Sequence, residues 1–330
     1  MEKRYKIVID TKGSDKGPEM MISGAVKALE KYPALEVLLV GDQALIKSEC
    51  ARLGAPGERI EILDAPDEIT NYDSPAMAIF AKPESSLVKA LDALSERSDL
   101  VGLINAGSTG ALIAGSMRFL SGPERVRPAL AAILPTSAAG FTCLVDTGAT
   151  IDCNAQTLVH FAHLGRDFMS KYYGIDNPRV GLLSNGAEPT KGNAVVKETH
   201  ALLKDDESVN FIGNIEGNGA LSGSCDVLVC DGFAGNQVLK ASEGMAKRMI
   251  TDIVKYSKMS GDESIMKLVG YLMSVYDFNS LGGGIILGIT KPVIKAHGAA
   301  NEQSVVSTAG MLLNMVANGE IFDRNADKMQ

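Results

Sequence analysis

Three aspartates in this sequence each end a short apolar run, a position from which a carboxylate could take part in chemistry. Asp10 closes "YKIVID", Asp146 closes "FTCLVD" and Asp231 closes "DVLVCD". A strand-end aspartate often only caps the following turn, but the carboxyl ends of parallel strands share one edge of a sheet, where ligands bind. Lysine binds phosphate as a point charge, so carboxylates and lysines at one edge would form a charge-balanced anion pocket. The lysines in these turns are Lys12, Lys191 and Lys240.

The stretch "NAGSTGALIAG", residues 105–115, has the composition of a strand-to-helix turn that receives an anion. Asn105 ends the strand, and Gly107 and Gly110 allow close approach of a ligand. Ser108 and Thr109 add hydroxyl donors, and a helix that opens here would offer backbone N–H groups to a phosphate or a developing oxyanion. A tight turn with an ordinary N-cap is the alternative. Neither a P-loop lysine nor the spacing G-x-G-x-x-G is present.

A second turn of this kind is "DGFAGNQVLK", residues 231–240. Gly232 and Gly235 would admit a substrate, and Asn236 would add a side-chain donor. Similar residues follow other predicted strands, and we expect them to bind substrate as well. They are Gly13, Gly148 and Glu188.

The histidines and cysteines give little support to metal or nucleophilic catalysis. His297 closes an apolar run and precedes a glycine, which suggests that it faces a ligand, although a structural role is the alternative. His160 and His163 are three residues apart but have no third ligand nearby. The five cysteines are scattered and read as buried free thiols. We therefore expect no metal and no cofactor.

Short apolar runs alternate with helical patterns along most of the chain. The helical stretch "EMMISGAVKALEKY" brings Met20, Ile22, Val26 and Leu29 near one face. Such alternation predicts an α/β fold with a mostly parallel sheet covered on both faces. No linker is visible, so residues 1–330 are expected to form one domain, with a helical protrusion at 256–283 that departs from this rhythm.

Composition excludes several classes of protein. The net charge of −8 over 330 residues and the absence of tryptophan argue against nucleic-acid binding. The amino-terminal run is too short for a signal peptide, and no run of apolar residues is long enough to span a membrane. We expect a cytoplasmic protein.

Seven stretches, in order along the chain, resemble the bacterial phosphate acyltransferase family (PlsX type). They are "NAGSTGALIAG", "RPALAAILP", "LVDTGATIDC", "RVGLLSNGAEPTKGN", "FIGNIEGN", "DVLVCDGFAGNQVLK" and "GGGIILGITKPVIKAHG". The chain departs from the family's usual residues at several polar positions, which makes it a divergent member. These positions are Lys12, Ser14, Ser108, Thr150, Ala187 and Asn218.

The resemblance implies both a fold and a reaction. The fold would be a three-layer α/β/α, Rossmann-like arrangement similar to isocitrate and isopropylmalate dehydrogenases. The reaction would transfer an acyl group from acyl-carrier protein to inorganic phosphate, giving acyl phosphate for phospholipid synthesis. Phosphate is itself a nucleophile and a thiolate leaves readily, so the protein need only hold phosphate and stabilise the oxyanion. The candidate catalytic residues are Lys191, Asn236, His297 and Asp231.

Two other functions stay open on the sequence. One is phosphate-dependent cleavage of a short-chain acyl thioester, as in an acetyltransferase or a reductase-complex subunit. The other is a non-catalytic relative that binds acyl-carrier protein.

The resemblance also implies a homodimer and contact with the inner face of the membrane. An apolar stripe at helical spacing could serve either contact. It consists of Ile265, Leu268, Leu272 and Met273, with Val269 and Tyr276 on the same side.

Overall fold

The computed structural model describes residues 4–123, 126–137, 140–276 and 283–317. The chain divides into two compact units, where the sequence analysis expects one domain. Unit 1 contains residues 1–128 and 281–330, and unit 2 contains residues 129–280. Unit 1 combines segments from before and after unit 2, because its sheet takes strands from both.

The sheet of unit 1 has the strand order β3-β2-β1-β4-β11-β10. Its strands run parallel except for the antiparallel pair β10 and β11. The carboxyl ends of β1, β4 and β11 therefore point to one edge. The strand bounds are β1 (Tyr5–Asp10), β2 (Leu35–Gly41), β3 (Ile60–Asp64), β4 (Leu100–Asn105), β10 (Gly284–Leu287) and β11 (Val293–Lys295).

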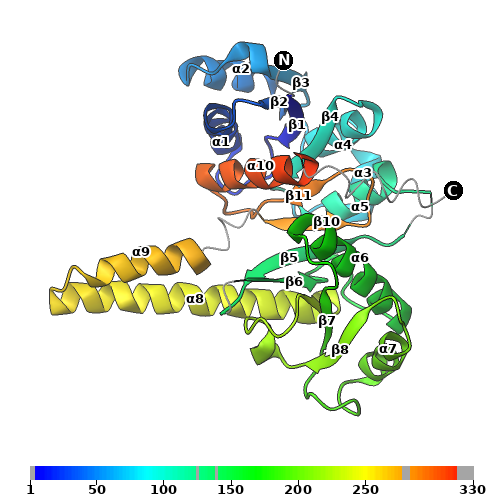
Figure 1. The fold of residues 1–330 in the computed structure, drawn as a ribbon. Coiled ribbons are helices and arrows are strands. Elements are labelled where there is room, and N and C mark those ends of the chain that lie inside the picture. Colours follow the sequence, from blue (N-terminus) through cyan, green and yellow to red (C-terminus); the bar gives the residue numbers. More distant parts are fainter. Residues whose placement is uncertain (1–3, 124–125, 138–139, 277–282, 318–330) are drawn as a thin grey trace. The chain divides into compact units, whose positions relative to one another are not determined.

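Helices cover both faces of this sheet (Figure 1). Helix α1 packs against α2 and α10, whereas α4 and α3 pack against α5. The helix bounds are α1 (Pro18–Lys31), α2 (Gln43–Arg52), α3 (Pro75–Ala81), α4 (Ser86–Glu96), α5 (Thr109–Phe119) and α10 (Glu302–Ala317), with a 3₁₀ turn η1 (Gly57–Arg59).

The sheet of unit 2 has the strand order β5-β6-β9-β7-β8. Only β5 and β6 are antiparallel, so β6, β9 and β7 end side by side. The strands are β5 (Ala129–Pro135), β6 (Phe141–Val145), β7 (Arg179–Leu183), β8 (Asn210–Ile215) and β9 (Val227–Val229). The helices are α6 (Ala155–Tyr173), α7 (Ala194–Lys204), α8 (Gly232–Ser260) and α9 (Ile265–Tyr276), with a 3₁₀ turn η2 (Gly217–Gly219).

The short strand β9 shows why the central strands are apolar throughout. The side chain of Val227 lies toward α6, because a Cβ added to Gly165 of that helix would come within 2.5 Å of it. Leu228, on the opposite face, joins a buried cluster into which Val238 and Leu239 of α8 pack. A strand covered on both faces needs apolar residues at every position, which confirms the mostly parallel, two-sided α/β fold expected from the sequence.

Helices α8 and α9 pack against each other as a hairpin that extends from the body of unit 2 (Figure 1). The hairpin begins at Gly232, much earlier than the protrusion expected at 256–283, and residues 277–282 lie outside the described residues. Only three residues of α8 are buried: Gly232, Gly235 and Ser257. The other residues of this 29-residue helix are half-buried or exposed.

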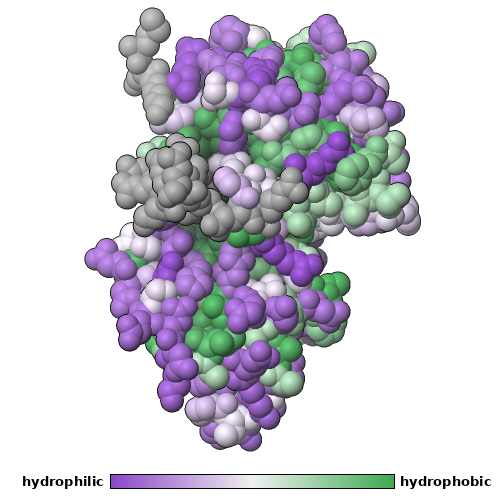
Figure 2. Space-filling view, turned by 90° about the vertical axis from the view of Figure 1, so that its right-hand side faces the viewer, coloured by the Kyte–Doolittle hydropathy of each residue, from purple (hydrophilic) through white to green (hydrophobic). Residues whose placement is uncertain are grey.

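Hydrophilic residues cover most of the face drawn in Figure 2, and apolar residues lie between them in small groups. Within the described ranges, every helix is either too short or too polar to cross a membrane.

Candidate active site

Asp10 and Asn105, at the ends of β1 and β4, hold two loops of unit 1 together. Both side chains are almost fully buried. Asn105 donates from Nδ2 to Oδ2 of Asp10 over 2.9 Å, and its Oδ1 accepts the N–H of Gly107 over 2.9 Å. Oδ1 of Asp10 accepts the N–H of Lys12 over 3.0 Å. These bonds link the loop after β1 to the turn that opens α5.

The buried position of Asp10 changes its protonation. Burial raises the pKa of this carboxyl to about 6, against the lowering effect of the hydrogen bonds from Lys12 and Asn105. Asp10 therefore exchanges its proton near pH 6, and its hydrogen bond with Asn105 places it beside the predicted anion turn of unit 1.

Glycines let the two loops touch. A Cβ added to Gly13, which has a φ of +80°, would lie 2.4 Å from the Cα of Gly107. Gly110 has a different reason for being glycine, since an added Cβ would lie 2.8 Å from the side chain of Pro75 at the start of α3. Packing between α3 and α5 thus requires a glycine at position 110.

The first turn of α5 has the features expected of an anion-binding helix end. Ser108 occupies the N-cap position but makes no side-chain capping hydrogen bond to any described residue. The N–H groups of Thr109 and Gly110 are therefore not bonded to a capping oxygen, and the partial positive charge of this helix end is not offset by one.

His297 follows β11, which pairs in parallel with β4 so that Lys295 lies opposite Asn105. The loop after it is tied to the loop after β1, because the N–H of Asp15 donates to the carbonyl of Gly298 over 2.9 Å. His297 accepts the N–H of Ala299 at Nδ1 over 3.2 Å. A neutral ring therefore carries its proton on Nε2. The structure thus brings His297, Asp10 and Asn105 to the same edge of the unit 1 sheet.

In unit 2, the side chain of Asp146 holds the loop after β6 by accepting hydrogen bonds from its backbone. Its side chain is fully buried. One oxygen accepts the N–H of Leu130 over 2.8 Å, and the other accepts that of Thr150 over 2.6 Å. The N–H groups of Gly148 and Ala149 also donate to it. Burial raises the pKa of Asp146 against these four bonds, and the geometry makes this residue a support of the loop rather than a ligand.

The first turn of α8 lies directly on that loop. Asp231 is the N-cap residue and accepts the N–H of Ala234 over 2.7 Å. The N–H of Gly232 donates to the carbonyl of Thr150 over 2.7 Å, and Asn236 donates from Nδ2 to the carbonyl of Thr147 over 3.2 Å. Because a carboxylate already caps α8, this helix end offers an anion less than that of α5 does.

Lys191 stands on the loop after β7, the strand next to β9. Its side chain is exposed, and the ammonium group has no hydrogen-bond or ion-pair partner among the residues that the structure describes. The stem of the side chain lies over Gly186, where an added Cβ would come within 2.7 Å of its Cγ. Glu188, in the same loop, is also exposed. The loops carrying Asp146, Asp231 and Lys191 therefore follow three neighbouring parallel strands, as expected.

The other two candidate lysines stand apart from Lys191. Lys240 lies further along α8, exposed and ion-paired with Glu243 over 2.7 Å. Lys12 lies in the loop of unit 1 after β1 and is half-buried. Of the two candidate lysines in unit 2, Lys191 is thus the better placed to meet an anion.

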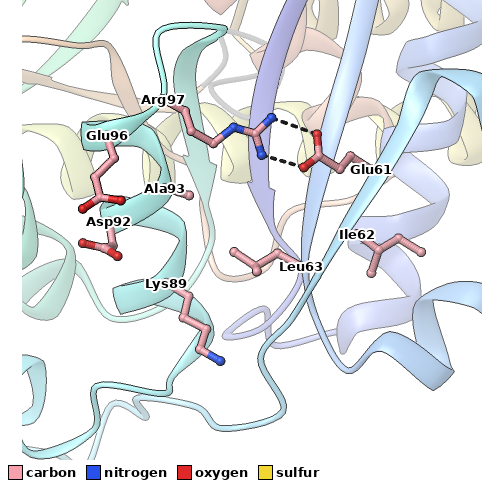
Figure 3. Close-up of a pocket in the computed structure, with 8 residues that line it drawn as sticks. All are labelled: Glu61, Ile62, Leu63, Lys89, Asp92, Ala93, Glu96 and Arg97. Carbon is pink, nitrogen blue, oxygen red and sulfur yellow. Dashed lines mark hydrogen bonds and ion pairs between the residues drawn. The ribbon is translucent and has the colours of Figure 1, made fainter.

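A shallow pocket of about 330 Å³ lies between β3 and α4 in unit 1 (Figure 3). Arg97 forms two hydrogen bonds with the carboxylate of Glu61 there, and it also bonds Asp99. Lys6 joins the same ion-pair network through Glu61 and Asp99. Lys6, Glu61 and Asp99 lie at the amino-terminal starts of their strands, so this ion-pair network is at the opposite edge from the candidate site, whereas the pocket itself continues along β3 to Leu63 and Lys89.

The described residues contain no group of three His, Cys, Asp or Glu side chains arranged to hold a metal ion.

Comparison with known proteins assigns the family. Residues 5–321 match the model of the family described as "Fatty acid synthesis protein". Phosphate acyltransferase of Caldanaerobacter subterraneus subsp. tengcongensis is 39% identical over 321 residues, covering 95% of this chain and 94% of its own. Phosphate acyltransferase of Halothermothrix orenii is 39% identical over 310 residues, covering 91% of each chain.

Solved structures show the same fold at low identity. EutD phosphotransacetylase from Staphylococcus aureus aligns with a TM-score of 0.61 at 14% identity, over 95% of this chain and 94% of that one. A phosphotransacetylase from Streptococcus pyogenes aligns with a TM-score of 0.59 at 15% identity, over 96% and 95%. The family match and the curated relatives confirm the resemblance read from the sequence: the chain belongs to the phosphate acyltransferase family and is an acyltransferase.

Proposed function

We propose that this protein transfers an acyl group from the thioester of acyl-carrier protein to inorganic phosphate, giving acyl phosphate for phospholipid synthesis. The observation that carries the proposal is Lys191, an exposed lysine without a partner in the described structure, on a loop beside those of Asp146 and Asp231. Lysine binds phosphate as a point charge, and no carboxylate among the described residues neutralises Lys191. Family membership supplies the acyl-transfer chemistry.

The reaction requires little of the protein beyond placement. A phosphate oxygen attacks the thioester carbonyl carbon, and collapse of the tetrahedral intermediate breaks the carbon–sulfur bond and releases the thiolate of acyl-carrier protein. We assign Lys191 to the phosphate charge and the Nδ2 group of Asn236 to hydrogen bonding of an oxygen in the reacting complex. Asp231 holds the first turn of α8, and Asp146 holds the loop with which Asn236 bonds.

For unit 1 we assign a separate contribution. The N–H groups at the start of α5 are donors of the kind that bind an anion, and His297 follows β11 at the same edge of the unit 1 sheet. The loops that bear them are fixed by Asp10 and Asn105. Gly13 and Gly107 permit the close approach of those loops.

The hairpin of α8 and α9 is proposed to serve homodimer formation and contact with the inner membrane surface, in a protein that otherwise works in the cytoplasm. Large apolar side chains are exposed on both helices, including Met245 and Met249 on α8 and Leu268 on α9. A single apolar side chain in solvent is ordinary, whereas a group of them marks an interaction surface.

The test is a direct assay of acyl phosphate, trapped with hydroxylamine, from phosphate and acyl-carrier protein thioesters of graded chain length. Lys191→Ala and Asn236→Ala should each lower the rate at least about tenfold, the loss of a donor worth roughly 1.4 kcal/mol at the transition state. Circular dichroism and thermal melting should match the wild type. Wild-type rates in both variants would remove these residues from the mechanism. A preference for acetyl thioesters would show that a short-chain acyl thioester, and not the proposed acyl-carrier protein thioester, is the donor.

A further inference from the structure

His200 and Asn214 form a buried polar pair in unit 2 that the sequence analysis does not single out. His200 lies on α7 and Asn214 on β8, and both are more than nine-tenths buried. Nδ1 of His200 lies 3.0 Å from Oδ1 of Asn214. The ring also meets Phe211 edge to face, with centroids 5.1 Å apart. Burying polar groups costs free energy unless they are hydrogen-bonded. We therefore ask which groups the hydrogen bonds of this pair hold in place.

The second hydrogen bond of Asn214 determines how its side-chain amide is oriented. Its Nδ2 donates to the backbone carbonyl of Glu188 over 2.9 Å. A carbonyl can only accept, so the amide nitrogen must face Glu188 and the amide oxygen must face the ring. Hence His200 carries a proton on Nδ1 and donates it. The chain of bonds runs from His200 through Asn214 to the main chain at Glu188.

That carbonyl belongs to the turn that presents Lys191. The oxygen of Glu188 also accepts the N–H of Lys191 over 3.0 Å, which closes the turn. Within the described residues, one further side-chain hydrogen bond supports the turn: Asn185 accepts the N–H of Gly192 over 2.8 Å. Most residues from 185 to 191 are exposed, so little packing holds this loop. The bond from Asn214 is thus its anchor to the interior of unit 2.

We propose that His200 and Asn214 are positioning residues, which hold the turn of Glu188 and Lys191 and thereby set the affinity of the enzyme for phosphate. The inference rests on the proposed contact between Lys191 and phosphate. Neither side chain touches the substrate; His200 fixes the amide of Asn214, and Asn214 fixes the turn.

Three substitutions separate this role from simple packing. Asn214→Asp keeps the acceptor for His200 but places an oxygen against the carbonyl of Glu188, which removes the tether at constant size. His200→Leu fills the pocket with an apolar side chain of moderate size, which cannot donate a hydrogen bond to Asn214. His200→Asn restores a donor at the position of Nδ1 in a smaller side chain. A matched control is His163→Leu, because His163 bonds Asp206 over 2.9 Å elsewhere in the same unit.

Two measurements test whether the turn is held in place and whether this affects the binding of phosphate. Hydrogen–deuterium exchange of the peptide 184–193 should accelerate in Asn214→Asp and His200→Leu and stay at the wild-type rate in His163→Leu. The KM for inorganic phosphate should rise about tenfold in the same two variants, since small misplacement of a binding group has effects of this size or larger. The KM for the acyl thioester should not change. His200→Asn should recover most of both losses.

Unchanged exchange in Asn214→Asp and His200→Leu would overturn the tether, and so would equal losses in His200→Asn and His200→Leu. Faster exchange with an unchanged KM for phosphate would overturn the link to substrate affinity. Lys191→Ala is assayed in parallel. If it keeps the wild-type rate, the proposed function of Lys191 fails, whereas the exchange data still decide whether the pair holds the turn.

Discussion

Asp10 is a residue whose chemistry depends on its burial more than on its sequence context. Any aspartate at a strand end can cap a turn, but this one is enclosed, and its oxygens meet Asn105 and the N–H of Lys12. Burial raises the pKa of its carboxyl to about 6. In the unfolded chain the pKa would return to its ordinary value near 4.

This shift gives a prediction for stability against pH. Between about pH 4 and pH 6 the folded protein holds a proton on Asp10 that the unfolded chain has lost, so the free energy of unfolding falls as pH rises. The contribution from this residue is at most about 3 kcal/mol, from two pKa units at about 1.4 kcal/mol each. Urea titrations of wild type and Asp10→Asn across this range measure it. The wild type should lose stability with rising pH more steeply than the variant, and parallel curves would contradict the shift.

Individual residues also show how far the sequence could predict the site. The sequence predicts that glycines, asparagines and aspartates follow the strands, because turn residues follow apolar runs, and Asp10 and Asn105 do end β1 and β4. Their partners were not predictable. Asn105 bonds Asp10 from 95 residues away, and Gly110 must be glycine because of Pro75. Asn214 lies within the quoted stretch "FIGNIEGN", but only the fold brings it to Glu188.

Helix α8 shows the same limit at the scale of an element. Its apolar pattern is interrupted by polar residues, so the sequence predicts a helical protrusion only over residues 256–283, around the stripe that begins at Ile265. The helix in fact starts at Gly232 and continues for 29 residues, until Gly261 takes a positive φ and ends it. Gly244, within the helix, does not interrupt it. Strands were easier to predict, because an apolar run such as residues 5–10 between polar turns coincides with β1.

The glycines of α8 provide a prediction with an internal control. A Cβ added to Gly235 would lie 1.9 Å from the carbonyl oxygen of Asp146 and 2.7 Å from Sγ of Cys230. Gly235→Ala must therefore push the first turn of α8 away from the loop after β6, at a cost of about 3 kcal/mol. Because Asn236 moves with that turn, acyl-phosphate formation should fall as well.

Gly244→Ala tests whether the effect is local. An added Cβ there meets no atom within 4 Å. Alanine favours a helix over glycine, so this variant should gain about 0.5–1 kcal/mol and keep its activity. Urea unfolding of the two variants beside the wild type makes the comparison. Equal stability of both variants would show that the contact with Asp146 does not constrain α8.

At the scale of the whole molecule, long-range strand pairing decides the division into units. Strand β11 pairs in parallel with β4, although unit 2 lies between them in the sequence. Local periodicity gives no sign of such a pairing, which is why the sequence analysis expects one domain over residues 1–330. The same pairing brings His297 beside the turn of Asn105, a proximity that the order of motifs along the chain could not reveal.

The exposed surface of the hairpin formed by α8 and α9 also belongs to the scale of the whole molecule, because it is the surface proposed to contact a second chain and the membrane. Ile265, Val269, Leu272 and Tyr276 recur at helical spacing on α9, and Val269 is buried there. Leu268 on the same helix is 49% exposed, and Tyr256 on α8 is 62% exposed. A charge introduced at Leu272, which is half-buried, could disturb the hairpin itself. Leu268 is therefore the better position for a test of the surface.

We expect wild-type protein to sediment with zwitterionic lipid vesicles and Leu268→Glu to remain in the supernatant, with activity on a soluble thioester unchanged. Lys255 and Lys258 are offset by Asp262 and Glu263, so apolar burial should drive the binding and salt should affect it little. Thr251→Glu, which adds the same charge at an exposed polar position of α8, is the control and should bind as the wild type does. Light scattering of each protein gives the oligomeric state. If Leu268→Glu separates a dimer, or if the wild type does not sediment, the hairpin is an interface between protein chains and not a membrane contact.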